Sequence, residues 1–194
     1  MRALVLFVSL SSLTVGALWL ANAGETSARE VASEVPERVD DLQSLSIEAK
    51  KINDFIYKID GQGAIFLINT KDGAVLVDTG YTGPQSAQQK ALVQKLATGP
   101  IRKLILTHAH PDHAGGLPRW SKEIEAGVEF VGHHRYGYMA RLQDEPLPYL
   151  KRRFHTLYPT QVDLTLEAPR PYWKMRPTRE VFPGSNYEFE LGGV

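Results

Sequence analysis

The stretch LILTHAHPDHAGG, residues 104–116, brings three of the chain's six histidines and an aspartate within six positions. It follows directly on the apolar run KLILT, residues 103–107, which predicts a short buried strand. In an α/β sheet, ligands usually bind outside the carboxyl ends of the strands. Single histidines occur as ordinary core or surface residues, but three of them with an aspartate at the end of a buried strand predict a metal site.

The spacing of these residues suits two neighbouring ions. Side chains alternate in an extended segment, so His108 and His110 point the same way and can share one ion. Pro111 then turns the chain, which leaves Asp112 and His113 to face a second ion. The chain has no cysteine, so any metal is held by nitrogen and oxygen donors.

Glycines follow the histidine loop at once. Gly115 and Gly116 have no side chains, and we expect them to let the next helix start close to the metals without collision.

Upstream of the loop, apolar runs predict most of a sheet. The runs AIFLI and AVLVD, residues 64–68 and 74–78, are joined by a segment with Asp72-Gly73 and predict a hairpin of strands buried on both faces. Alternation in FIYKI, residues 55–59, predicts another strand, and order is expected to begin near Leu45.

Helical and strand patterns then alternate along the chain. Pro84 stands where a first helical position is expected, and apolar residues at helical spacing continue until Gly99-Pro100. VEFVG, residues 128–132, predicts a strand, and RYGYMARL, residues 135–142, predicts a helix. This order favours an α/β fold.

A family resemblance rests on two of these segments. THAHPDH, residues 107–113, resembles the His-x-His-x-Asp-His signature of the metallo-β-lactamase superfamily, and VLVDTG, residues 75–80, resembles the strand and turn that precede it. The resemblance runs from about Ser46 to the end. It implies an α/β (α+β) fold, a four-layer αββα sandwich of two mixed sheets with helices outside and the metal site at one edge. The domain would occupy residues 45–194 and supply the first half of the sandwich with part of the second.

The resemblance also implies roles for individual residues. His108 and His110 match ligands of a first metal, and Asp112 and His113 match ligands of a second. Asp112 would also hold and aim the attacking hydroxide, which makes it the expected catalytic residue. Asp78 matches an aspartate close behind the site that orients a ligand or the loop. The alternative for Asp78 is an ordinary polar residue that ends a strand before a turn.

The implied function is that of a zinc-dependent hydrolase. Two zinc ions lower the pKa of a shared water towards about 7, and the hydroxide attacks an ester, thioester, phospho- or sulfo-ester, or lactam bond of a small molecule. Iron or manganese can occupy the same donors, so an iron-dependent oxidoreductase similar to sulfur dioxygenases is one alternative. A truncated, non-catalytic module is the other.

The chain departs from the family pattern after the histidine loop. The family completes its sites with a histidine in a Pro-Gly-His-Thr-like turn, a bridging aspartate and a final histidine, and none of these motifs follows here. NYEFELGGV, residues 186–194, alternates like a strand, turns at its glycines and stops. We therefore expect a domain that is incomplete at its carboxyl end, with little activity of its own.

The N-terminal residues predict export. Arg2, an apolar run and the small residues before Gly24 are typical of a signal peptide over residues 1–23, cleaved after Ala23. An uncleaved membrane anchor is the competing interpretation, because the apolar run is long. Residues 24–44, with six acidic residues against two arginines, predict a solvated, flexible leader. We expect a periplasmic or secreted protein without stable membrane association after cleavage.

Charge and composition limit the classes of partner that we expect. Lys plus Arg and Asp plus Glu both number 22, which gives no reason to expect nucleic acid as a partner, and the oligomeric state stays open. Residues 146–179 carry seven basic and two acidic residues, a local charge of +5, together with six prolines. They form either an irregular surface excursion or the wall of a pocket for an apolar or anionic substrate.

Three histidines lie outside the loop. His133 and His134 follow a predicted strand, and they are interpreted either as solvated residues at the strand's end or as substitutes for the absent ligands. His155 is expected on an exposed basic helix.

Overall fold

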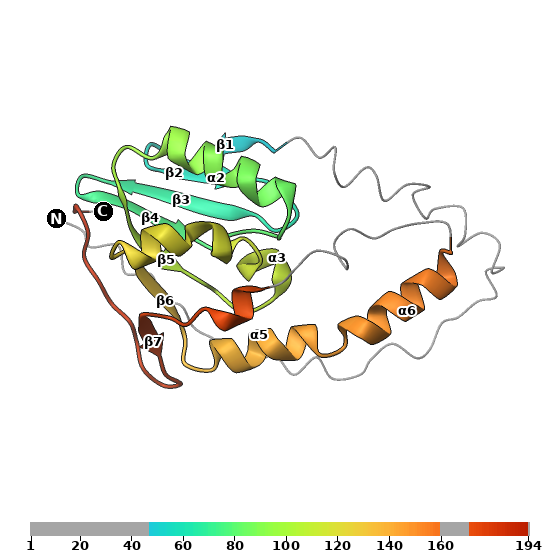
Figure 1. Cartoon of the computed structure of the whole chain (residues 1–194). Coiled ribbons are helices and arrows are strands. Elements are labelled where there is room, and N and C mark those ends of the chain that lie inside the picture. The colour runs from blue at the N-terminus through green and yellow to red at the C-terminus, as the bar shows by residue number, and fades with distance from the viewer. Residues whose placement is uncertain (1–46, 160–170, 194) are drawn as a thin grey trace, which may run out of the picture.

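The computed structural model describes residues 47–159 and 171–193. They form a seven-stranded mixed sheet in which the strands lie side by side in chain order, β1 to β7 (Figure 1). The α/β class is confirmed, and the described residues contain one mixed sheet of the expected sandwich. The predicted signal peptide and leader, residues 1–23 and 24–44, lie outside the described residues.

Antiparallel strands make up the first part of the sheet. They are β1 (Ala49–Lys51), β2 (Ile56–Ile59), β3 (Ile65–Thr70) and β4 (Gly73–Val77). The predicted hairpin is confirmed: β3 pairs with β4, and Gly73 opens β4 with a φ of 131°. A side chain is strained at such an angle, so glycine suits this turn. Order was expected to begin near Leu45, which lies outside the described residues, and the first strand of the described chain begins at Ala49.

Parallel strands make up the rest. They are β5 (Ile101–Ile105), β6 (Glu129–His133) and β7 (Arg179–Val181). β4, β5, β6 and β7 pair in parallel, so their carboxyl ends meet at one edge of the sheet. β5 lies two residues earlier than the run KLILT, and β6 ends one residue later than VEFVG. The histidine loop leaves the sheet at this edge.

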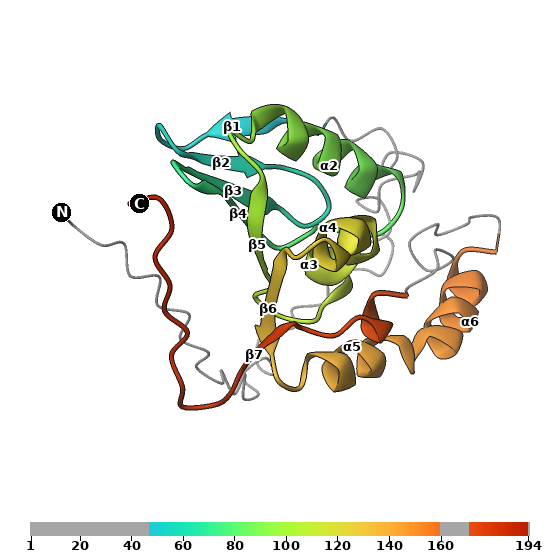
Figure 2. The same ribbon diagram turned by 60° about the vertical axis from the view of Figure 1, so that its left-hand side comes forward.

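Helices cover one face of the sheet (Figure 2). They include α2 (Pro84–Leu96), the 3-10 helix η2 (Leu117–Trp120), α4 (Ser121–Glu125), α5 (Tyr136–Asp144) and the 3-10 helix η3 (Pro171–Lys174). Pro84 is the first helical residue of α2, as predicted. Val93 of α2, Trp120 of η2 and Tyr172 of η3 pack on the sheet in one hydrophobic core. Burial of such apolar side chains is the main term that holds the layers together.

The C-terminal segment lies over the opposite face (Figure 2). Tyr187, Phe189 and Leu191 pack on the buried side chains of β4, β5 and β6. The predicted alternation of residues 186–191 is therefore present, although these residues form no strand. Burial of β3 on both faces was wrong: its residues alternate, and Phe66 on this second face is 36% exposed.

A polar cluster ties this segment to the sheet. Glu129 of β6 accepts hydrogen bonds from Lys103, from Tyr187 at 2.7 Å and from Arg179 at 3.2 Å. Burial raises the pKa of the Glu129 carboxyl, but the three hydrogen bonds outweigh it and bring the pKa to about 2. Glu129 is therefore ionised at neutral pH and anchors the segment.

An amphipathic helix extends from the body beyond α5. This helix, α6 (Leu147–Leu157), has no buried residue, and His155 is exposed on it as predicted. Residues 146–179 were expected to form an irregular surface excursion or a pocket wall, but residues 147–157 within them are helical, with Pro148 in the first turn, where proline is tolerated. Within the described ranges, no helix combines the length and the apolar character that a membrane span requires.

Candidate metal centre

Asp78 begins the site immediately after β4. Its backbone adopts a left-handed conformation with φ 61°, which aspartate tolerates better than most residues, and its N–H donates to Ile105 O at 2.8 Å. The residue is only 4% exposed. A buried carboxylate requires hydrogen-bond donors around it, and the following loop supplies them.

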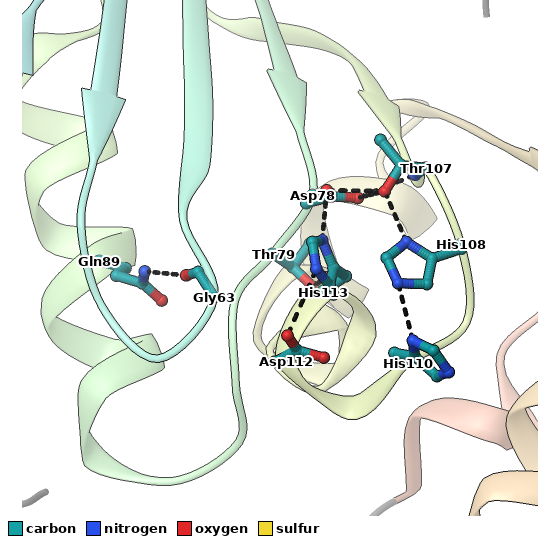
Figure 3. A network of polar contacts seen from close by, with 9 residues as sticks. All are labelled: Gly63, Asp78, Thr79, Gln89, Thr107, His108, His110, Asp112 and His113. Atoms are coloured by element: carbon teal, nitrogen blue, oxygen red, sulfur yellow. Dashed lines mark hydrogen bonds and ion pairs between the residues drawn. The ribbon is translucent and has the colours of Figure 1, made fainter. Parts of the chain in front are cut away.

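Three donors surround the Asp78 carboxylate (Figure 3). The Thr107 backbone N–H donates to Oδ1 at 2.8 Å, and the Thr107 hydroxyl donates to Oδ2 at 2.8 Å. His113 Nδ1 lies 2.8 Å from Oδ2. A carboxylate fixes the tautomer of a histidine in this way and turns its Nε2 outward as a free donor to a metal. The structure thus places Asp78 directly behind the loop.

His108 is oriented from the same side. Its Nδ1 lies 3.0 Å from the Thr107 hydroxyl, and its Nε2 lies 2.9 Å from His110 Nδ1. Burial lowers the pKa of His108, and the neighbouring His113 and His110 lower it further. A lowered pKa favours the neutral ring, which is the form that binds a metal.

The remaining two residues form a second pair. Asp112 and His113 belong to the short helix α3 (Pro111–Ala114), and His113 Nε2 lies 3.3 Å from Asp112 Oδ2. The rings of His113 and His108 are 4.1 Å apart between centroids, so the two pairs adjoin each other. Among the described residues no three His, Asp or Glu side chains surround one point as a bound ion would require. The four donors lie as two neighbouring pairs.

This donor set has the chemistry that zinc prefers. Zinc binds imidazole nitrogen and carboxylate oxygen. The inner nitrogens of His108 and His113 are engaged with Thr107 and Asp78, while their Nε2 atoms face His110 Nδ1 and Asp112 Oδ2. Each pair therefore presents two donors, one of which is oriented from behind.

The glycines after the loop have a different purpose from the expected one. A side chain on Gly116 would meet Thr79 O at 2.0 Å, and one on Gly115 would meet Thr82 N at 2.7 Å. The Gly116 N–H also donates to Gly80 O at 3.0 Å. Both glycines allow the chain after α3 to pack on the backbone that follows β4. The close approach is to residues 79–82 rather than to the metal positions.

A loop that the sequence patterns did not single out also touches the site. The residues between β2 and β3 bring Gly63 against Asp112, where a side chain on Gly63 would lie 1.6 Å from the Asp112 carbonyl oxygen. Gly63 has a φ of 87° and Gly61 a φ of 152°. The spacing Gly-Gln-Gly, residues 61–63, was the available signal, since paired glycines often mark a close backbone approach.

Two further histidines lie at the same edge of the sheet. His133 ends β6 and His134 follows it, with ring centroids 4.3 Å apart. Both are half-buried rather than fully solvated, because the His134 ring stacks on Phe182 with centroids 4.9 Å apart. Neither ring hydrogen-bonds to the histidine loop in the described chain.

Known proteins resemble this chain in sequence and in fold. A sequence profile of the metallo-beta-lactamase superfamily matches residues 59–192. The linear primary-alkylsulfatase of Pseudomonas sp. (strain ATCC 19151) is 35% identical over 57 residues, which are 29% of this chain and 11% of that protein.

Solved structures that resemble this chain include a metallo-beta-lactamase and an alkyl sulfatase. The metallo-beta-lactamase FIM-1 from Pseudomonas aeruginosa in its mono-zinc form is 22% identical, with a TM-score of 0.43 over 51% of this chain and 47% of that one. A double mutant of the sec-alkyl sulfatase PisA1 is 19% identical, with a TM-score of 0.47 over 58% of this chain and 19% of that one. The matched region spans less than half the length of each of these three relatives. Because the profile covers more than half of the chain and includes the His-x-His-x-Asp-His loop, the chain belongs to the metallo-beta-lactamase superfamily.

Proposed function

We propose that this chain carries the metal-binding part of an exported, zinc-dependent hydrolase. One observation carries the proposal: the donors of His108, His110, Asp112 and His113 lie as two adjoining pairs. Asp78 and Thr107 orient one histidine of each pair, His113 and His108, from behind. The buried Asp78 carboxylate is tolerated because it is hydrogen-bonded, and one of those hydrogen bonds fixes the inner nitrogen of His113. His108 and His110 would hold one ion, and Asp112 and His113 a second.

The reaction follows from these positions. The four donors would hold zinc, which would supply a water with its pKa lowered towards about 7 and a positive charge that polarises the oxygen of the group under attack. Asp112 lies at the outer side of the loop, where its carboxylate is half exposed beside His113 Nε2. It can accept a hydrogen bond from the attacking water and hold that water in line with the substrate. His113 keeps its orientation through Asp78 during this step.

A sulfate ester is the first substrate class to test. The alkylsulfatase that is 35% identical over 57 residues supports an alkyl sulfate as the small-molecule substrate. The donor geometry favours no single bond type, because the same water attacks carboxylic esters, thioesters, phosphate esters and lactams.

The test uses the full-length protein with defined metal content. We expect zinc to co-purify or to bind on addition. We also expect a higher rate of hydrolysis for dodecyl sulfate than for phenyl acetate, a phosphodiester or a chromogenic cephalosporin. Asp112→Asn and His113→Ala should each lower the rate by about a hundredfold or more. His155→Ala, on the exposed helix α6, is the matched control and should retain the rate.

Two results would overturn the proposal. Absence of bound metal under every loading condition would remove the site, and unchanged rates in both loop variants would remove its role. Iron content with oxygen uptake on a sulfur substrate would instead support the iron-dependent oxidoreductase, since iron accepts the same donors.

Export is a separate part of the proposal. The signal-like residues 1–23 support it. Expression of the full-length protein with its own N-terminus, followed by fractionation and N-terminal sequencing, should give a mature chain that begins at Gly24. An intact N-terminus in the membrane fraction would favour an uncleaved anchor.

A further inference from the structure

Helix α2 carries two glutamines on its buried face. Gln85 and Gln89 lie one helical turn apart, and both are almost fully buried, with Gln89 only 1% exposed. An amide in a protein interior is unfavourable unless it forms hydrogen bonds. Apolar residues would fill the same space at lower cost, so the partners of the amides indicate why they are there.

Both glutamines hold the backbone of the loop between β2 and β3. Gln89 Nε2 donates to Asp60 O at 3.1 Å. It also donates to Gly63 O at 2.9 Å (Figure 3). Gln85 Oε1 accepts the Gln62 N–H at 3.0 Å. Three backbone groups within four residues are thus fixed to one rigid helix.

The loop in turn rests on the metal centre. Gly63 is in direct contact with the backbone carbonyl of Asp112, as shown by the 1.6 Å that would separate a Gly63 Cβ from Asp112 O. Because Gly63 has a φ of 87° and no side chain, the loop fits against α3 without displacing it. Any shift of Gly63 towards α3 must therefore move Asp112.

Gln89 touches the other support of α3 as well. A Cβ on Gly80 would lie 2.0 Å from Gln89 Oε1, and Gly80 O accepts the N–H of Gly116, which follows α3. Gln89 Oε1 is buried and has no hydrogen-bond partner among the described residues. Gln89 therefore donates both hydrogen bonds to the loop while its Oε1 accepts none from the described residues. An apolar residue at this position would not bury an unsatisfied oxygen.

We infer that Gln89 is a positioning residue for Asp112: it fixes Gly63 against the Asp112 backbone and thereby sets where the Asp112–His113 pair lies. This inference rests on the proposed function, in which that pair binds the second metal ion. It predicts that Gln89 affects the second ion more than the first, because Asp112 and His113 lie between Gly63 and the pair formed by His108 and His110 (Figure 3).

Cobalt titration of the full-length metal-free protein tests the inference. Gln89→Met keeps the volume and removes the donors, and Gln88→Met, at the exposed neighbouring position on α2, is the matched control. In Gln89→Met we expect affinity for the second Co²⁺ to fall about tenfold, with a changed absorption spectrum for that ion, while the first Co²⁺ binds as in wild type. Gln88→Met should match the wild type for both ions.

Gly63→Ala provides an independent route to the same displacement. Its methyl group would collide with the Asp112 carbonyl, so it should also weaken the second Co²⁺ selectively. This variant carries the test if Gln89→Met does not fold, which thermal unfolding of the metal-free proteins will show.

The outcomes separate the two claims. A wild-type protein that binds no Co²⁺ contradicts the proposed function. The role of Gln89 is overturned if the wild type binds two ions and the variants Gln89→Met and Gly63→Ala bind the second ion with wild-type affinity and spectrum. In that case the two variants would differ from the wild type only in unfolding temperature.

Discussion

Two groups of histidines lie at the carboxyl ends of neighbouring parallel strands, and in the described chain only one of them is hydrogen-bonded to a buried carboxylate. In the loop after β5, Thr107 and Asp78 engage the inner nitrogens of His108 and His113. After β6, His133 Nδ1 accepts the Arg135 backbone N–H at 3.2 Å, and the buried His134 Nδ1 has no hydrogen-bond partner among the described residues.

The difference lies in the partners of the rings rather than in their number. Both groups contain rings within 4.6 Å of each other between centroids. Neither His133 nor His134 hydrogen-bonds to a carboxylate in the described chain, whereas His113 bonds to Asp78. A carboxylate behind a histidine fixes its tautomer and raises its strength as a ligand. Metal binding should therefore depend on Asp78 and Thr107, so substitutions at these two residues test the difference between the two histidine groups.

Asp78→Asn should have the largest effect. Asparagine tolerates the left-handed backbone, so the variant tests the carboxylate rather than the turn. It retains only one acceptor oxygen for the Thr107 and His113 donors and turns an N–H₂ towards one of them. We expect metal affinity to fall about 10- to 100-fold and the free energy of unfolding to fall by about 2 kcal/mol. Metal content by mass spectrometry and urea unfolding measure the two effects.

The matched control is Asp72→Asn, in the exposed turn between β3 and β4. It should leave metal content unchanged. If Asp78→Asn bound metal as tightly as this control, orientation from behind would not be what separates the two histidine groups.

Thr107→Val should have an intermediate effect. Valine keeps the shape and the backbone N–H to Asp78 but removes the hydroxyl that contacts both Asp78 and His108 Nδ1. We expect affinity for the ion held by His108 and His110 to fall about tenfold. Thr107→Ser restores the hydroxyl and should recover most of the loss in a cobalt titration. A loss in Thr107→Ser as large as that in Thr107→Val would contradict the role of the hydroxyl, because serine retains it.

Much of the fold can be read from local sequence. The apolar runs and the Asp72-Gly73 turn predict the β3–β4 hairpin, and Pro84 marks the start of α2. Exposure of Phe66 could not be predicted in this way, because it depends on what covers the second face of the sheet rather than on the strand itself.

Part of the site could also be predicted from local sequence. The donors of the loop are adjacent in sequence, so their spacing alone brings them together. The contacts that position them are not local: Asp78 meets His113 across 35 positions, and Gly63 meets Asp112 through backbone packing. The roles of Gly115 and Gly116 were misassigned because the backbone they approach, residues 79–82, comes from a different strand end. Such contacts require the fold to be known.

The smallest expected effect is a loss of folding stability at acidic pH, when His133 of the second histidine group takes up a proton. Burial, His134 and Arg135 hold the pKa of His133 below its ordinary value of 6.5. As pH falls through 6.5 the unfolded chain takes up a proton at this position before the folded protein does. The stability that neutral His133 contributes is therefore complete above pH 6.5 and is lost as pH falls towards the folded-state pKa.

His133→Asn separates this titration from the hydrogen bond. Asparagine Oδ1 can accept the Arg135 N–H as His133 Nδ1 does, but it does not titrate. In urea unfolding of the metal-free protein, the variant and the wild type should agree within about 0.5 kcal/mol at pH 7.5. The wild type should lose more stability on acidification to pH 5.5. Parallel curves would show that protonation of His133 costs the fold nothing, and the contrast with the loop after β5 would then rest on the hydrogen bonds of Asp78 and Thr107 alone.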